Sequence, residues 1–232
     1  MKTKTTLFAW ETGFPSVCGQ TSISFLKRLS DFDSAKRGDL DAAKKIVSRC
    51  VNRQRILEIK RRYPNAELIP VITDNQLPLA LAQAIGLKIC PNIVKTGNNQ
   101  RKTMNAMERL LHQPTFFGHV KRKTEYILVD DIVTQGGTVA ALRRHVIAGG
   151  GTVVAVVALA YACGSEKLSP EHKNVRLLEQ RFGYRQIGSI LREYLILRNS
   201  YELTNQQVLY LLRFHKITSL LNKISATLSR EG

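Results

Sequence analysis

The stretch from Tyr126 to Thr138, YILVDDIVTQGGT, constrains the fold more than any other part of the chain. Four apolar residues run into two adjacent carboxylates, Asp130 and Asp131, and a loop with two glycines then opens a helical pattern. This order predicts a buried strand, a tight turn and a helix. Such a junction directs backbone N–H groups and the positive end of a helix dipole at one point, which is what a phosphate monoester requires.

The polar residues of the same stretch suit a sugar phosphate. The glycine pair lets the backbone approach a ligand closely, and Thr134 and Thr138 add hydroxyl donors. The two carboxylates, placed at the carboxyl end of the strand, can accept hydrogen bonds from vicinal hydroxyls of a ribose. The stretch therefore predicts a site for a ribose 5-phosphate. An ordinary turn between a strand and a helix, with two exposed aspartates, is the structural alternative.

The stretch resembles the phosphoribosyl-pyrophosphate (PRPP) loop of the type I phosphoribosyltransferases, which has a hydrophobic strand, an acidic pair and a T-x-G-G-T turn. The resemblance implies that Asp130 and Asp131 face the ribose hydroxyls and act in catalysis. It also implies that Mg²⁺ binds through PRPP, with these two carboxylates as candidate metal ligands. The residues that would hold the 5-phosphate are Thr134, Gln135, Gly136, Gly137 and Thr138. Gln135 stands where the family has a small residue.

A second strand and turn precede this motif. Glu67 to Thr73, ELIPVIT, predicts a buried strand, and a helix is expected from Pro78 to Ile85, where Gly86 ends it. In the family, the loop after this strand contacts the pyrophosphate. The candidate residues on that side are Thr73, Asp74, Asn75 and Gln76. A simple polar turn is the alternative for each of them.

The region after this helix is long and basic. Leu87 to Val94 predicts a further strand, and the polar segment from Thr96 to Lys123 follows. In the family a flexible flap occupies this place, and the spacing is most similar to that of the competence-associated members, where a short helix and a second strand follow. Lys95, Arg101 and Lys102 are the candidates for stabilising the departing pyrophosphate. A solvated basic loop is the alternative.

The alternation of strands and helices predicts an α/β fold, a mostly parallel sheet flanked by helices, as in the type I phosphoribosyltransferases. Thr152 to Tyr161 is apolar throughout, which is typical of a strand covered on both faces. The helix from Val139 to Ala148 should turn Arg143 and Arg144 outward. We expect an N-terminal segment over residues 1–38, an α/β core over 39–161 and a helical appendage over 162–232, in which Thr204 and Gln207 form a capping box.

Composition leaves the partners open. The 232 residues hold 35 Lys and Arg against 18 Asp and Glu, a net charge of +17. Such a charge attracts polyphosphate substrates or nucleic acid. The basic residues from Lys36 to Arg62, expected on one helical stretch from Asp33 to Tyr63, favour a second hypothesis, a PRPP-sensing regulator or nucleic-acid-binding protein without transferase activity. The acceptor base stays unidentified, and a homodimer is a further expectation drawn from the family.

Several classes of protein are excluded or disfavoured. No apolar run approaches twenty residues, so no membrane span is expected. The cysteines and histidines are scattered and form neither a C-x-x-C pair nor an H-E-x-x-H motif, which disfavours a disulfide framework or a structural zinc site. We therefore expect a cytoplasmic protein. The resemblance to the type I phosphoribosyltransferases implies that its metal, Mg²⁺, arrives with the substrate.

Overall fold

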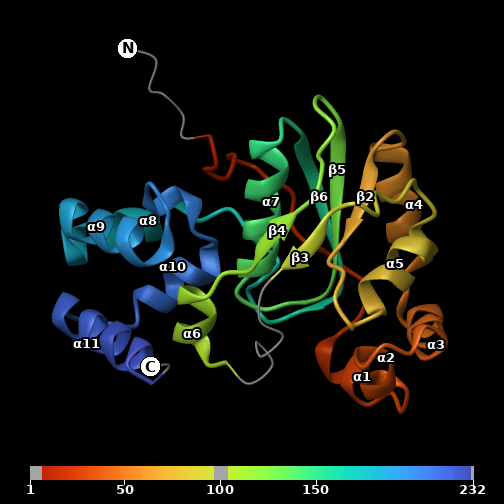
Figure 1. Cartoon of the computed structure of the whole chain (residues 1–232), viewed down its shortest axis with the longest axis horizontal. Helices are drawn as coiled ribbons and strands as arrows, with labels where there is room; N and C mark the ends of the chain where they lie inside the picture. The colour runs from red at the N-terminus through yellow and green to blue at the C-terminus, as the bar shows by residue number, and fades with distance from the viewer. Residues whose placement is uncertain (1–6, 97–103, 231–232) are drawn as a thin grey trace.

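The computed structural model describes residues 7–96 and 104–230. Its centre is a four-stranded parallel sheet with the strand order β1-β6-β5-β2 (Figure 1). The four strands are β1 (Cys18–Gly19), β2 (Glu67–Pro70), β5 (Glu125–Val133) and β6 (Thr152–Tyr161). The predicted parallel α/β sheet is thus confirmed. β1, which comes from the N-terminal segment and pairs with β6, was not anticipated from the sequence.

Helices cover both faces of the sheet, which explains the apolar character of its central strands. Side chains alternate along β5: Ile127 and Val129 pack into the core under α3 (Leu40–Cys50) and α5 (Leu77–Ile85). Tyr126 and Leu128 pack into the core under α7 (Gly137–Ala148) on the other face. The long apolar runs of β5 and β6 are therefore buried on both sides, as expected of parallel strands.

The basic stretch after residue 30 is three helices rather than the single helical stretch predicted. They are α2 (Phe32–Lys36), α3 and α4 (Arg53–Arg62). Gly38, with φ of +112°, separates the first two. The Asp39 side chain then caps α3 by accepting from the Ala42 N–H, and the Asn52 side chain caps α4. These local capping bonds break the helical pattern. The predicted end of the helical region at Tyr63 is confirmed.

The strand predicted over Leu87 to Val94 is wrong for most of its length. Among the described residues, this segment makes only an isolated parallel bridge, Leu68 to Ile89, and β3 (Val94–Thr96) begins where the prediction ends. Pro91, which has no N–H to donate, interrupts the run. The expected short helix and second strand are confirmed as α6 (Ala106–Leu111) and β4 (Thr115–Phe117), which pairs with β3 in antiparallel fashion.

Arg143 of α7 was predicted to face solvent but is 1% exposed. Its guanidinium donates to the carbonyl oxygens of Phe8 (3.0 Å) and Ala9 (3.1 Å) and lies 4.6 Å from the ring centroid of Trp10. Arg144 is half-buried and donates to Gln113 Oε1. The outward prediction failed because the N-terminal segment packs over this face of the helix, a contact that helical periodicity cannot reveal.

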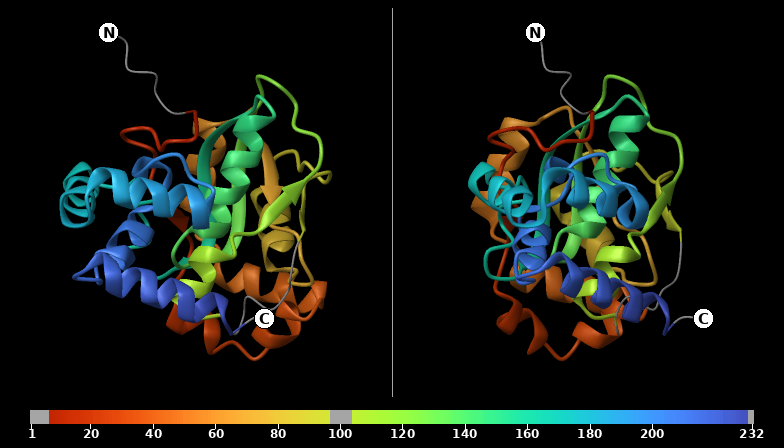
Figure 2. Two further views of the ribbon diagram at one scale, coloured as in Figure 1. Left: turned by 60° about the vertical axis from the view of Figure 1, so that its left-hand side comes forward. Right: turned by 90° about the vertical axis from the view of Figure 1, so that its left-hand side faces the viewer.

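The C-terminal residues form a helical unit beside the sheet (Figure 2). Its elements are α8 (His172–Phe182), α9 (Tyr184–Leu195), the 3-10 helix η2 (Ser200–Glu202), α10 (Asn205–Leu211) and α11 (Ile217–Leu228). The predicted capping box of Thr204 and Gln207 begins α10. These helices share a hydrophobic cluster with α6. No helix in the described ranges has the length and apolar character needed to span a membrane.

Candidate functional site

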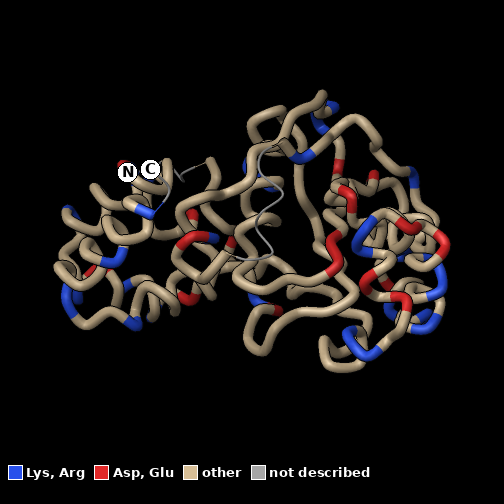
Figure 3. The backbone as a smooth tube through the Cα atoms, turned by 60° about the horizontal axis from the view of Figure 1, so that its bottom comes forward, with Lys and Arg blue, Asp and Glu red and all other residues tan. Residues whose placement is uncertain are grey.

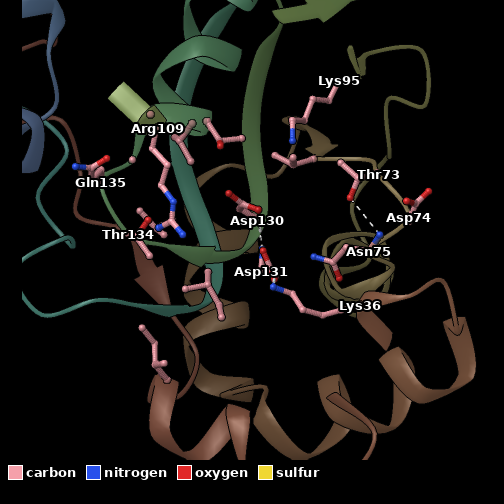
Figure 4. A pocket seen from close by; sticks show the side chains of 18 of the residues that line it. Lys36, Thr73, Asp74, Asn75, Lys95, Arg109, Asp130, Asp131, Thr134 and Gln135 are labelled. Carbon is pink, nitrogen blue, oxygen red and sulfur yellow. Dashed lines mark hydrogen bonds and ion pairs between the residues drawn. The ribbon is translucent and has the colours of Figure 1, made fainter. Parts of the chain in front are cut away.

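A cavity of about 480 Å³ opens at the carboxyl ends of β2 and β5 (Figure 4). Ligands in open parallel sheets bind at this edge. Residues far apart in the sequence meet here, from α1 (Ile23–Lys27), α2, β3, α6 and the loops after β2 and β5. The charged residues that line the cavity are Lys27, Lys36, Asp74, Lys95, Arg109, Asp130 and Asp131. Four are cations and three are acids, so the cavity offers partners to an anion and to hydroxyl groups.

The acidic pair lies on the floor of this cavity. Asp130 and Asp131 are each 7% exposed, and the Asp131 N–H donates to Asp130 Oδ1 at 2.9 Å. Burial raises the pKa of Asp130 well above its usual value, and the neighbouring Asp131 carboxylate adds to that rise. A buried carboxyl with a raised pKa gains from a ligand that donates hydrogen bonds to it, since such bonds replace the lost water.

Lys36 is a site residue that sequence reasoning missed. Its Nζ lies 2.9 Å from Asp131 Oδ2, and Figure 4 shows the side chain extending from α2 to the acidic pair. Phe32 and Ala35 are buried and hold α2 against the core. The sequence contained no signal for this contact, because Lys36 is one of many lysines in a basic stretch and meets Asp131 only through the packing of α2.

The loop after β5 is held by bonds to the segment that follows β6. Three successive carbonyl oxygens accept hydrogen bonds from that side of the molecule. Val133 O accepts from Ala162 N at 2.8 Å, Thr134 O from Ser165 Oγ, and Gln135 O from Thr204 Oγ1. All described peptide bonds are trans, so the N–H of each unit points opposite to its carbonyl. The N–H groups of Thr134, Gln135 and Gly136 are therefore turned away from the C-terminal residues.

Two of these N–H groups, together with that of Gly137, are candidate donors to an anion. Within the described part of the chain, the N–H groups of Gln135, Gly136 and Gly137 donate to no other group. They lie at the N-terminus of α7, whose dipole adds partial positive charge, and all three residues line the cavity. A phosphate would satisfy donors that the protein leaves without partners. The loop predicted from the T-x-G-G-T motif thus places N–H donors at a helix N-terminus beside the cavity, and phosphate binding there stays a prediction.

Gly136 is required by its backbone and by a neighbour. Its φ is +74°, and a Cβ at this position would lie 2.7 Å from Leu168 Cδ2 and 3.1 Å from Thr204 Cγ2. From the sequence, the two glycines were expected to allow close approach by a ligand. In the structure, the groups that approach Gly136 closely are the side chains of Leu168 and Thr204, two residues of the C-terminal region.

The predicted pyrophosphate-side residues lie on the other side of the acidic pair. Thr73, Asp74 and Asn75 line the cavity. The Thr73 hydroxyl accepts from the Asn75 N–H at 3.1 Å, and Asn75 Oδ1 accepts from the Leu77 N–H, which starts α5. Gln76, the fourth predicted residue, is absent from the lining and forms the N-cap of α5.

The cations predicted on this side are described only in part. Lys95 extends from β3 toward the cavity, on the opposite side of the acidic pair from Arg109 in Figure 4. Arg101 and Lys102 lie outside the described residues. Lys27 and Arg109 line the cavity without having been selected from the sequence. No local pattern marks Arg109, because α6 also carries Glu108 and Arg109 reaches the cavity through the packing of the helix.

The described residues contain no group of three or more His, Cys, Asp or Glu that could hold a metal ion. The carboxylates that line the cavity are those of Asp74, Asp130 and Asp131, and the Lys36 ammonium pairs with Asp131. Mg²⁺ keeps several waters and commonly binds one or two carboxylates together with substrate phosphates. The aspartates present fit a magnesium ion that is held by one or two carboxylates together with the oxygens of a phosphorylated ligand.

Comparison with known proteins found no matching family model. The chain is similar to protein TraN of Escherichia coli, at 28% identity over 73% of this chain and 40% of TraN. It is also similar to an uncharacterized protein of Haemophilus influenzae, at 28% identity over 60% of this chain and 33% of that protein. The chain thus matches well under half the length of either relative.

Solved structures that resemble the chain include an adenine phosphoribosyltransferase, with 17% identity, a TM-score of 0.35 and coverage of 50% of this chain and 74% of that one. Another is the purine phosphoribosyltransferase of Pyrococcus horikoshii, with 16% identity, a TM-score of 0.33 and coverage of 46% and 67%. The Leishmania donovani UMP synthase matches at 13% identity and a TM-score of 0.33, over 75% of this chain and 33% of that one. None of these likenesses identifies an activity, and the resemblance to competence-associated members stays a prediction.

Proposed function

We propose that the protein binds PRPP with Mg²⁺ and transfers its 5-phosphoribosyl group to a nitrogenous base, releasing pyrophosphate. One observation carries this proposal: the acidic pair and the N–H groups of the loop at the start of α7 open on the same cavity. In sequence they belong to one motif, and in space they offer one site for hydroxyls and an adjacent site for a phosphate. A ribose 5-phosphate carries hydroxyl groups at one end, which would bind the acidic pair, and a phosphate at the other, which would bind the loop.

On this proposal, the cavity divides the substrate between its two sides. The loop from Thr134 to Thr138 takes the 5-phosphate, and Asp130 and Asp131 accept hydrogen bonds from the ribose hydroxyls. Thr73, Asp74 and Lys95 face the pyrophosphate, and Arg101 and Lys102 remain predicted contributors there. Cations placed where negative charge develops on the leaving group lower the barrier electrostatically.

In this reaction the protein mainly positions the reactants and stabilises the charge on the leaving group. The C1–O bond to pyrophosphate breaks, and a nitrogen of the base forms the new bond at C1. Holding both reactants in line supplies much of the acceleration. Mg²⁺ would be bound through substrate oxygens, with Asp130 and Asp131 as its candidate protein ligands, and would neutralise the pyrophosphate. The proposal places the protein in the cytoplasm, and the four cysteines are free thiols.

The second candidate function is a regulator that senses PRPP or binds nucleic acid. It is favoured by the net charge of +17 and by α4, where only Ile56 is buried while Arg53, Arg61 and Arg62 are exposed. Figure 3 shows that Lys and Arg are spread over the molecule with acidic residues among them. Because Lys and Arg occur on segments throughout the described chain, with acidic residues among them, we favour the transferase.

The deciding experiment measures pyrophosphate release from PRPP and Mg²⁺ with a panel of purine and pyrimidine bases. Asp131→Asn keeps the shape of the side chain but removes the negative charge, so we expect turnover to fall at least about 100-fold. PRPP binding without turnover on any base would support the sensing protein. Binding to duplex DNA or RNA that weakens steeply with salt would support the nucleic-acid reading. Absence of PRPP binding would refute both PRPP-dependent functions.

A further inference from the structure

The C-terminal helical unit and the cavity are connected through α6. Met107 is fully buried and Leu110 is 1% exposed, and both belong to the hydrophobic cluster formed with α8 to α11. A capping box of Asn105 and Glu108 fixes the start of α6. This short helix therefore has its orientation set by the C-terminal unit, because its buried side chains have no other cluster to join.

Arg109 lies on a different face of α6 from these anchors. Met107 and Leu110 are three residues apart and share one face, whereas Arg109 projects from another face and lines the cavity. Figure 4 shows its guanidinium beside Thr134, the first residue of the phosphate loop. The packing of Met107 and Leu110 thus places an arginine over the loop whose N–H groups point into the cavity.

We propose that Arg109 is a phosphate-binding residue and that the C-terminal helical unit builds this half of the site. The C-terminal residues position two groups that would contact the same anion, the phosphate loop and Arg109. Ser165 and Thr204 hold the carbonyls of Thr134 and Gln135, which turns the loop N–H groups away from the unit, and α6 delivers Arg109 across from them. A phosphate dianion then lies between backbone donors at the α7 N-terminus and a guanidinium, which can donate two parallel hydrogen bonds.

This inference rests on the proposed function only for the identity of the sugar. A phosphate held by Arg109 would be the 5-phosphate of PRPP, because the pyrophosphate side of the cavity is lined by the loop after β2 and by Lys95. Arg109 would accordingly select phosphorylated over unphosphorylated ribose. Lys95 and Arg109 would bind different ends of one substrate. Loss of Lys95 should therefore weaken the binding of pyrophosphate, whereas loss of Arg109 should weaken the binding of phosphate and ribose 5-phosphate.

The test uses Arg109→Met, which removes the charge and keeps much of the length, and Arg109→Lys, which keeps the charge but loses the planar fork. Arg176→Met is the matched control, since Arg176 is an exposed arginine of α8 outside the cavity. Binding of inorganic phosphate, ribose 5-phosphate and pyrophosphate is measured by calorimetry. We expect Arg109→Met to weaken phosphate and ribose 5-phosphate about 10- to 100-fold, the loss typical of a hydrogen-bonded charge.

Pyrophosphate binding should change less than about threefold in this variant, because the loop after β2 and Lys95 line that side of the cavity. Arg109→Lys should retain part of the phosphate affinity, and Arg176→Met should retain all of it. Equal losses for phosphate and pyrophosphate would overturn the inference, since they would indicate a general field or a damaged fold. Unchanged binding of ribose 5-phosphate by Arg109→Met would overturn it as well.

The Asp131→Asn variant separates this inference from the proposed function. If Asp131→Asn abolishes turnover while Arg109→Met binds ribose 5-phosphate normally, the transferase stands and the role of Arg109 is refuted. If phosphate binding depends on Arg109 but PRPP supports neither binding nor turnover, the phosphate site stands and the transferase is refuted. A wild-type protein that binds neither phosphate nor ribose 5-phosphate would refute both.

Discussion

Thr204→Val tests whether the C-terminal unit holds the phosphate loop in place. Thr204 is 1% exposed, and its hydroxyl donates to Gln135 O while it accepts from the Gln207 N–H at 3.2 Å. Valine has nearly the same shape but can make neither bond. Its additional methyl also cannot approach the Gln135 carbonyl as closely as a hydroxyl does. The substitution therefore removes a helix cap and a loop anchor together.

The expected cost follows from these two bonds. Loss of an N-cap costs about 1 kcal/mol. A buried carbonyl left without its partner costs about 1–3 kcal/mol. The sum, about 2–4 kcal/mol, corresponds to a decrease in Tm of about 5–15 °C for a chain of this size. The freed Gln135 peptide can rotate, so we also expect weaker binding of PRPP and of inorganic phosphate, by about tenfold.

Thermal denaturation gives the stability change, and calorimetry below the transition gives the binding change. Thr227→Val is the matched control, because Thr227 is also buried at 3% exposure but donates to Lys223 O inside α11, outside the cavity lining. A threonine that bonds back within its own helix contributes little to stability. The reasoning would be refuted if both variants lost the same stability and Thr204→Val bound phosphate as tightly as the wild type.

The other predictions concern buried charges. Asp130→Asn should raise Tm at neutral pH by about 2–4 °C, because the raised pKa of Asp130 means that the free energy of unfolding falls as the pH rises above the ordinary carboxyl pKa. Melting curves over a pH series should show this gain shrinking on acidification, and a gain independent of pH would contradict the assignment. Arg143→Met should destabilise the protein by about 1–3 kcal/mol by leaving the Phe8 and Ala9 carbonyls without their donor. Limited proteolysis should then cleave the segment over residues 8–14 faster than in the wild type, whereas an unchanged cleavage rate would show that the guanidinium does not hold this segment.

Local patterns in the sequence were sufficient for the elements that carry their own signals. The strand from Tyr126, the glycine turn and the start of a helix were predicted from thirteen consecutive residues, and β6 was predicted from its own apolar run, Thr152 to Tyr161. The capping box at Thr204 was also predicted, because its two hydrogen bonds join residues three apart. Where a signal depended on context the predictions failed: Pro91 interrupts the strand expected before Val94, and the N-terminal segment buries Arg143.

Some residues of the candidate site were likewise predicted from the sequence, and others were placed there only by the tertiary structure. The acidic pair and the phosphate loop were read from the sequence, because a strand, a turn and a helix in succession bring their own residues together. Lys36 and Arg109 could not be, since each reaches the cavity through the packing of its helix against distant residues. The orientation of the loop carbonyls was likewise settled by Ser165 and Thr204. Tertiary contacts alone determine which way a peptide unit points, and hence which N–H groups are left for a ligand.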